Sequence, residues 1–368
     1  MEFVIISILV CLIYGIQHIY FRKHWNQQLQ VGLSFQSKGI QAGETCGLEE
    51  TIRNGKRMPL PTLQVKFRTD ASFRFAEDQN AVTTDYYYRR DLFSVGGKKK
   101  VSRCLKFRAR QRGYFQIPEV DILVKNYFLT KQYSLRQTNE TALYVYPYKR
   151  DTKPFDLLYR QMMGEVIAKQ RLEEDPFAFR GIREYRATDP MHRINWKSSA
   201  RNGSLLVNCF ESTTTQTICV LLDGQTQSVY ASRQMQEAVI SVASSVAGRL
   251  LQAGIPVALY SNARDVLTKE LIRTESGSHR SHMETIDCSL ARIDLEQPML
   301  PFVDLLGVAV EQEGDSCCYL VISSNDRPSF RQEYLRQREN AIEMFGIILC
   351  ESQEQWEPLE GLYPWEVD

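Results

Sequence analysis

The most constraining feature of the sequence is an apolar run at its start, residues 3–21, which only Gln17 and His18 interrupt. At about 1.5 Å per helical residue the run is about 28 Å long, which matches the hydrocarbon core of a bilayer. A cleaved signal peptide would have a basic start and small residues at its cleavage site. Here Glu2 precedes the run and bulky aromatic residues end it. The sequence therefore predicts one transmembrane helix in residues 1–24.

The two sides of this run differ in charge. Arg22, Lys23 and His24 follow it directly, and no Lys or Arg precedes it. Because Lys and Arg are enriched on the cytoplasmic side of membrane helices, we expect this flank in the cytoplasm. The nine cysteines are irregularly spaced and include no CxxC pair, which also fits a reducing compartment. We expect a single-pass protein of the cell membrane, with its N-terminus outside and its later domains in the cytoplasm.

Residues 28–150 show the pattern of an all-β domain. Residues 29–35, for example, alternate apolar and polar side chains with period two, which is typical of a half-buried strand. Asn54-Gly55 is a tight-turn signal. Residues 113–118 and 120–125 are interpreted as a hairpin-like pair of strands. Many short strands separated by turn signals predict a sandwich-like domain.

One turn of this β-domain carries three consecutive lysines, residues 98–100. A run of charges is usually solvated, and we interpret this one as an exposed loop. Contact with anionic lipid is the alternative. The segment contains no catalytic constellation.

From residue 217 the pattern changes to apolar strands that alternate with helices. Residues 217–223 form a continuous apolar run ending in Asp223, as in a buried parallel strand. Residues 232–253 place apolar side chains on one helical face, and Gly254 follows as a C-cap. Further strands are expected at residues 255–260, 317–323 and 343–349, the last of the sheet, and further helices at residues 302–310 and 330–340. The alternation predicts an α/β doubly wound parallel sheet in residues 212–368.

In such a sheet ligands bind at the carboxyl ends of the strands, where Asp223 lies. The predicted domain resembles the von Willebrand factor A type, in which this position opens a magnesium motif, Asp-x-Ser-x-Ser. This chain has Gln225 and Gln227 instead of the serines, and Ser323, followed by Asp326, where a second acid is expected. Glutamine is longer and would crowd a hydrated Mg²⁺ ion. We therefore expect no metal and no cofactor, with Asp223 capping a turn or the next helix; a magnesium site is the minor alternative.

An arginine-rich motif lies between the two predicted domains, within residues 180–211. It resembles the signature of the bacterial family called domain of unknown function 58. The matching positions, in order, are Arg180, Gly181, Arg183, Tyr185, Asp189, Arg193, Ile194, Trp196, Ala200, Arg201, Leu206, Val207 and Glu211. The overall layout is similar as well, although the family commonly has two N-terminal helices. We place the motif and a connecting helix in residues 151–211.

The motif can be interpreted in two ways. In a structural clamp, arginines pair with Glu184, Asp189 and Glu211, while Trp196 is a buried wedge. In an anion site, the guanidinium groups bind phosphate or carboxylate. We favour the clamp, because the interspersed acids would compete with an anionic ligand.

Motifs of common enzymes are missing from the sequence: it has no GxxxxGK[ST], HExxH or GxSxG. His279 and His282 lie in residues 274–282, which are polar and expected to form a loop. The chain has 45 Lys and Arg against 44 Asp and Glu, so it lacks the basic excess of a nucleic-acid binder. The sequence thus predicts a protein that is not an enzyme.

The resemblance supplies the candidate partners. Members of the family are commonly encoded beside MoxR-type AAA+ ATPases and often beside transglutaminase-like membrane proteins. It therefore implies a membrane-anchored scaffold or adaptor that acts with such an ATPase and, as a second partner, with a transglutaminase-like protein. We expect the ATPase to bind at the carboxyl edge of the parallel sheet, around Asp223 to Gln227 and Ser323 to Asp326, because these loops are polar and carry no catalytic set. The alternative is an unrecognised enzyme or an anion-binding protein that uses residues 180–201.

Overall fold

The structure is a computed structural model that describes residues 2–77, 80–172, 179–185, 191, 194–210, 217–225, 233–314, 317–339, 343–350 and 356–367. The chain divides into two compact units, which are described separately. The first comprises residues Met1–Tyr148 with Leu290–Ile293, and the second residues Lys149–Ser289 with Asp294–Asp368.

The first unit begins with helix α1 (Glu2–His24). Among the described helices, it alone is long and apolar enough to cross a membrane by length and composition. Its large side chains are exposed over the first half, from Phe3 to Ile13, whereas Phe21 is fully buried. The expected N-terminal apolar helix is therefore present, and only its second half, from Tyr14 onward, packs against protein.

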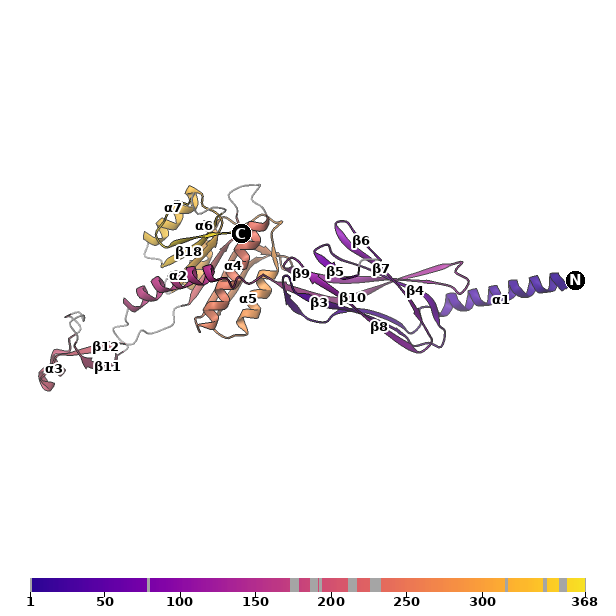
Figure 1. Cartoon of the computed structure of the whole chain (residues 1–368), viewed down its shortest axis with the longest axis horizontal. Coiled ribbons are helices and arrows are strands. Elements are labelled where there is room, and N and C mark those ends of the chain that lie inside the picture. The colour runs from indigo at the N-terminus through magenta and orange to yellow at the C-terminus, as the bar shows by residue number, and fades with distance from the viewer. Residues whose placement is uncertain are drawn as a thin grey trace. The chain divides into compact units, whose positions relative to one another are not determined.

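The β-domain that follows α1 consists of two facing sheets (Figure 1). One has the strand order β1-β3-β8-β5 and the other β2-β10-β9-β4-β7-β6, and every pairing is antiparallel except that of β2 with β10. Inward side chains of both sheets form one core, as in a sandwich. The strands are β1 (Leu29–Phe35), β2 (Gly39–Gln41), β3 (Thr45–Asn54), β4 (Leu60–Asp70), β5 (Phe73–Phe75), β6 (Ala81–Thr83), β7 (Tyr86–Val95), β8 (Lys99–Ala109), β9 (Gly113–Lys125) and β10 (Gln132–Tyr146).

The hairpin expected within residues 113–125 is wrong. These residues form one continuous strand, β9, which passes through Pro118. Proline cannot donate a ladder hydrogen bond, so a break was expected there. The partner strand β10 has a bulge opposite it, between Thr138 and Thr141, and the side chain of Asn139 donates to the carbonyl of Ile117 at 3.0 Å. The bulge accommodates the missing donor without ending the strand.

The second unit contains a mixed sheet in the order β15-β14-β13-β17-β18-β19. The pairings from β14 to β19 are parallel, and β15 is an antiparallel edge. Helices α6 and α7 share one core cluster with the sheet, while α4 packs against the other face. The elements are α2 (Lys153–Leu172), β13 (Ile218–Asp223), α4 (Arg233–Gln252), β14 (Val257–Asp265), β15 (Leu271–Gly277), α5 (His282–Ala291), β16 (Ile293–Asp294), α6 (Phe302–Glu313), β17 (Cys318–Ser323), α7 (Pro328–Glu339), β18 (Met344–Cys350) and β19 (Leu362–Glu366).

The described ends of most of these elements lie within a few residues of the predicted ones. Gly254 ends α4 with φ +77°, a left-handed conformation that favours glycine. Two predictions are wrong. Residues 274–277 belong to β15 and His282 begins α5, so only residues 278–281 of the expected loop, with His279, lie outside helix and strand. β18 is not the last strand, because β19 pairs beside it.

A small module carries the arginine-rich motif. Strands β11 (Phe179–Glu184) and β12 (Leu206–Phe210) pair antiparallel, and helix α3 (Trp196–Asn202) lies between them in sequence. Asn195 caps α3 by accepting a 2.9 Å hydrogen bond from the Ser198 amide, and Gly203 ends it with φ +70°. We call β11, α3 and β12, together with the described residues between them, the signature module.

Candidate functional site

Asp223 lies at the carboxyl end of β13 and is fully buried. Its Oδ1 accepts hydrogen bonds from the Asn262 side-chain amide at 2.7 Å and from the Gln225 backbone amide at 3.0 Å. Its Oδ2 accepts from the Ser323 hydroxyl at 2.8 Å. The bond to Gln225 caps the turn after the strand, which is the turn-capping role expected for Asp223.

Neighbouring groups close this edge further. Asn262 Oδ1 accepts from the Gly224 amide at 2.9 Å, and the Ser323 hydroxyl accepts from the Asn325 amide at 2.8 Å. Asp326 takes no part in these bonds and pairs with Arg331 instead, whose Nη2 donates to Oδ2 of Asp326 at 2.8 Å. The edge is thus a hydrogen-bonded network in which both oxygens of Asp223 already have protein donors. Gln227 lies outside the described residues.

Burial raises the pKa of the Asp223 carboxyl, although the hydrogen bonds from Gln225, Ser323 and Asn262 act in the opposite direction. Mg²⁺ needs a deprotonated carboxylate and several further oxygen ligands. Within the described ranges, no group of three or more His, Cys, Asp or Glu side chains is arranged to hold a metal ion. His282 donates from Nε2 to the carbonyl oxygen of Val257 at 2.9 Å, so its ring makes a structural hydrogen bond to β14.

The burial of Asp223 also bears on partner binding. A side chain with no exposed surface cannot contact another protein, so the prediction that Asp223 belongs to a partner-binding surface is wrong. Asp326, with 19% of its side chain exposed, is accessible at the same edge.

The signature module is organised around Ser199. Its hydroxyl accepts from the Leu206 amide at 2.9 Å and donates to the Asn195 carbonyl at 2.8 Å. The side-chain amide of Asn195 also donates to the side-chain oxygen of Asn208 at 2.7 Å. These bonds fix α3 against β12, while Val207 and Ile194 are buried beneath it.

Large apolar side chains lie on the outside of the signature module. Trp196 is 66% exposed and Met191 is 73% exposed, and Ile182 and Leu205 are exposed as well. The interpretation of Trp196 as a buried wedge is therefore wrong. It begins α3, where the Asn195 cap turns the chain and leaves the indole outside the hydrogen-bonded core.

The structure brings together only part of the predicted motif. Gly181, Arg183 and Tyr185 lie on or beside β11, and Ala200 and Arg201 lie on α3. Arg183 donates to the carbonyl of its neighbour Glu184 at 3.1 Å. Three of the predicted residues, Asp189, Arg193 and Glu211, lie outside the described residues, and of Arg180 only the backbone is described.

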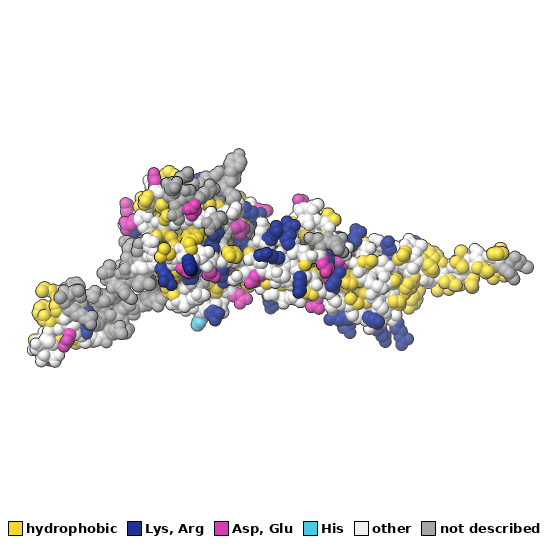
Figure 2. Space-filling model, viewed as in Figure 1, with side chains coloured by type: hydrophobic (Ala, Val, Ile, Leu, Met, Phe, Trp, Pro, Cys, Tyr) yellow, Lys and Arg dark blue, Asp and Glu magenta, His cyan; other side chains and the backbone are white. Residues whose placement is uncertain are grey.

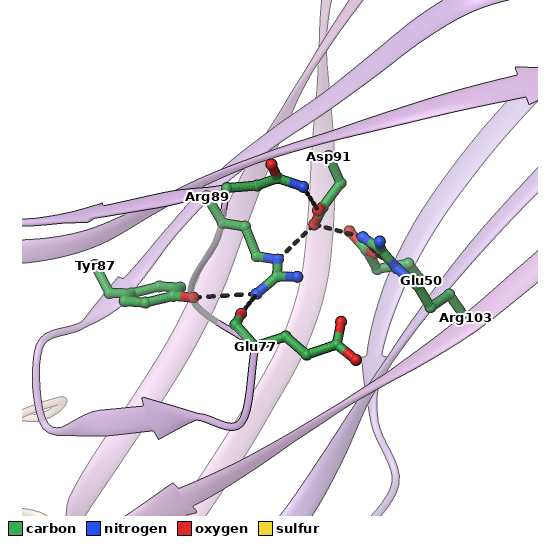
Figure 3. A network of polar contacts seen from close by, with 7 residues as sticks. Glu50, Glu77, Tyr87, Arg89, Asp91 and Arg103 are labelled. Carbon is green, nitrogen blue, oxygen red and sulfur yellow. Dashed lines mark hydrogen bonds and ion pairs between the residues drawn. The ribbon is translucent and has the colours of Figure 1, made fainter.

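A buried ionic network in the β-domain was not predicted from the sequence (Figure 3). Asp91 on β7 pairs with Arg89 at 2.6 Å and with Arg103 of β8, in the facing sheet, at 2.6 Å. Arg103 also pairs with Glu50 on β3 at 2.6 Å. The network connects the two sheets through the core. The sequence did contain a signal for this network, because the alternation along β7 puts Arg89 and Asp91 on the same inward face as Phe93.

Glu50 is the member of this network with an incompletely satisfied carboxyl group. Its side chain is inaccessible to solvent, and its Oε1 has no hydrogen-bond partner among the described residues. Burial, together with the charge of Asp91, raises the pKa of Glu50 to about 7 against the lowering effect of Arg103. The network resembles a structural pin rather than a site open to substrate, because its four charged groups lie between the sheets.

Comparison with known proteins gives one family. Residues 181–314 match the model of the family described as "Protein of unknown function DUF58". The match begins in the signature module and continues to the end of α6. No curated protein matches the chain.

Likeness to solved structures is weak. The chain is similar to the CARDB domain of the PF1109 protein from Pyrococcus furiosus (10% identity, 31% of this chain and 94% of that one, TM-score 0.20). It is also similar to a non-cellulosomal cohesin from Archaeoglobus fulgidus (11% identity, 32% and 91%, TM-score 0.22) and to the sporulation control protein Spo0M from Bacillus subtilis (9% identity, 43% and 58%, TM-score 0.19). Scores this low carry no argument about function.

Proposed function

Because the chain belongs to the DUF58 family through residues 181–314, we propose that it is a non-catalytic scaffold or adaptor anchored in the membrane by α1. The charge of Arg22 and Lys23 supports an orientation with both folded units in the cytoplasm. The α/β unit is, in this proposal, a domain of von Willebrand factor A type. Its parallel sheet with one antiparallel edge strand, β15, and helices on both faces supports that assignment.

The observation that carries the proposal is the apolar surface of the signature module. Single exposed apolar side chains are ordinary, but here Ile182, Met191, Trp196 and Leu205 all lie exposed on one small module. Trp, Met and Arg are enriched in protein interfaces, and Trp is a frequent energetic anchor. Arg201, which is also exposed, ends the same helix. This composition fits a protein partner better than a small anion.

The chemistry of the sheet edge supports a binding role over an enzymatic one. Asp223 would be the reactive group at the ligand-binding edge of a doubly wound sheet. Its oxygens accept hydrogen bonds from Asn262, Gln225 and Ser323, and it is inaccessible to solvent. A general base must reach the proton that it removes, so this carboxylate is poorly placed for catalysis.

The partner proposed is a MoxR-type AAA+ ATPase, and a transglutaminase-like membrane protein is the second candidate. Both come from the family resemblance. Anchoring by α1 adds a physical reason, since confinement to the membrane surface raises the effective concentration of any co-localised partner. An interface centred on Trp196 can be small and transient, below the standard size of about 1,600 Å².

The test is capture of the ATPase by the full-length protein from its own membrane, with nucleotide hydrolysis blocked. Trp196→Ala should lower the recovered ATPase by about tenfold, the effect of losing one aromatic anchor. Leu157→Ala is the matched control, because Leu157 is 70% exposed on α2 of the same unit. If Trp196→Ala captures as much ATPase as the wild type, the signature module is not the contact site. If no variant captures the ATPase, the ATPase is not the partner.

A further inference from the structure

The loop between β9 and β10, residues 126–131, lies along the end of α1. The hydroxyl oxygens of Tyr14 and Thr130 are 3.0 Å apart. The ring of Phe21 meets that of Tyr127 edge-on, with 5.4 Å between centroids. Tyr14 and Phe21 are two turns apart on one helical face, so the loop follows the helix instead of touching it at a point.

The contacts fix how far this loop reaches along α1. The ring of Tyr14 also lies 5.6 Å from that of Phe128. Tyr14 precedes Phe21 by seven residues, which is about 10 Å along a helix. Residues 3–13 alone are about 16 Å long, roughly half of a hydrocarbon core of about 30 Å. A helix that spans the bilayer with residues 3–21 therefore carries Phe128 into the lipid beside Tyr14.

The tip of the loop is apolar and exposed. Phe128 is 53% exposed, Leu129 is 58% exposed, and Tyr127 is 38% exposed. Leu129 has φ +58°, a left-handed conformation that a bulky residue rarely adopts. Glycine or asparagine would suit such a turn better, so this position keeps a large apolar side chain at a conformational cost.

Four of the six backbone amides of the loop donate to acceptors within the loop, which lowers the cost of bringing them into lipid. Asn126 is fully buried, and its Oδ1 accepts from the amides of Thr130 at 2.8 Å and Lys131 at 3.1 Å. The amide of Asn126 donates to the Lys131 carbonyl, and that of Leu129 to the Asn126 carbonyl.

Positive charge surrounds this apolar tip. Three further segments, residues 22–28, 54–60 and 96–100, lie at the same end of the β-domain. The Gly55 amide donates to the Gln28 carbonyl at 2.9 Å, the Lys98 amide to the Lys56 carbonyl at 2.8 Å, and the Tyr127 hydroxyl to the Pro59 carbonyl at 3.1 Å.

These segments and the loop with its flanking Lys125 contain nine cations and no acidic residue. The cations are Arg22, Lys23, Lys56, Arg57, Lys98, Lys99, Lys100, Lys125 and Lys131. Figure 2 shows Lys and Arg side chains gathered on the β-domain near its apolar helix. The Lys56 ammonium donates to the carbonyls of Trp25 and Gln27, so we call the other eight residues the basic collar.

From this arrangement we infer that the end of the β-domain is a second membrane contact. Residues 127–129 enter the lipid beside α1, and the basic collar binds the phosphates of anionic phospholipids around them. Long Lys and Arg side chains reach headgroups while their stems stay apolar, and clusters of this kind next to a membrane helix recognise anionic lipid. The inference rests on the anchoring by α1 that the proposed function assumes.

Photo-crosslinking of the full-length protein in vesicles tests the insertion. The vesicles contain equal parts of phosphatidylcholine and phosphatidylglycerol. Benzoylphenylalanine, an aromatic residue that reacts with nearby C–H bonds, replaces Phe128 in one variant and Tyr86 in the control. Tyr86 is 45% exposed and begins β7, whose other end leads into the basic collar. A lipid adduct is expected at position 128 and not at position 86.

The outcomes separate this inference from the proposed function. Resistance of the protein to alkaline extraction measures anchoring by α1 independently. Anchored protein without a lipid adduct at position 128, or with an adduct to a second protein chain instead, overturns the inference alone. Protein that is extracted from the vesicles overturns the anchor and the inference with it.

Trypsin tests the basic collar. On anionic vesicles, cleavage after residues 98–100 should slow by at least about tenfold relative to pure phosphatidylcholine, and high salt should restore it. Arg110 is the internal control, because it is exposed at the opposite end of β8. Equal cleavage rates at residues 98–100 in both lipids would overturn the assignment of anionic headgroups to the collar.

Discussion

The side-chain amide of Asn262 donates a hydrogen bond of 2.7 Å to Oδ1 of Asp223. The two residues belong to neighbouring parallel strands, β14 and β13, and both are fully buried. This bond occupies the carboxylate oxygen at the edge of the sheet where a metal-binding domain would need a free ligand.

We expect no saturable Mg²⁺ binding at millimolar concentration, because the protein itself supplies donors to both oxygens of Asp223. Titration calorimetry on the detergent-solubilised protein measures it, with Asp223→Ala as the comparison. Asp223→Ala should also lower the free energy of unfolding by about 3 kcal/mol, since it leaves the donors of Asn262 and Ser323 unpaired. A saturable Mg²⁺ signal that Asp223→Ala abolishes would contradict this account of the edge.

Stability should depend on pH through Glu50. Its pKa rises from 4.5 to about 7 on folding, so the folded state holds a proton that the unfolded state has released between these values. The protonated Glu50 therefore stabilises the folded state at low pH. This contribution to the free energy of unfolding is lost as the pH rises from about 4.5 to about 7, and it is on the order of 3 kcal/mol at most. Glu50→Gln should flatten this decline in thermal melts, whereas Glu49→Gln, on the same strand, should not. Parallel pH profiles for wild type and Glu50→Gln would refute the assignment.

Trp196→Ala should leave the signature module folded, because the indole is 66% exposed. We expect a change in the free energy of unfolding within about 0.5 kcal/mol, as for most surface substitutions. Val207→Ala, at a position only 1% exposed, should cost about 2 kcal/mol instead. Hydrogen exchange of β11 and β12 reports on the module directly. Faster exchange in Trp196→Ala than in Val207→Ala would restore the wedge interpretation.

A reporter fused after Asp368 should be active only in the cytoplasm, because Arg22 and Lys23 follow the apolar helix directly. Paired reporters that work on opposite sides of the membrane make the measurement. As a control, Arg22→Glu with Lys23→Glu should reduce the bias in orientation. Activity outside the cytoplasm, or a shortened chain cut after residue 21, would rule out the anchor and its direction.

Much of the α/β unit could be predicted from sequence because its signals are local. The apolar run before Asp223 and the helical periodicity before Gly254 placed β13 and α4 closely. The family resemblance is confirmed over residues 181–314. β19 escaped prediction because Pro364 lies within it. A proline is tolerated there, since β19 pairs with β18 on one side and is the last strand of the sheet.

The candidate sites were harder to predict, because their partners are distant in sequence. Asn262 lies 39 residues after Asp223, and nothing around it signals a hydrogen bond to a carboxylate. The exposure of Trp196 follows from the Asn195 cap and the packing of Ser199, which are tertiary features. The pairing of Arg103 with Asp91 likewise depends on two sheets meeting face to face.

The junction between α1 and β1 consists of residues 25–28 alone, and Trp25 within it is only 7% exposed. The Trp25 amide donates to the Phe21 carbonyl, which continues the helix into the core of the β-domain. A connection this short and this packed is a rigid joint. Helices in bilayers adjust their tilt when the thickness of the hydrocarbon core changes. If α1 spans a bilayer as proposed, such a tilt turns the β-domain as well, and the thickness of the membrane then changes the angle at which the domain stands on its surface.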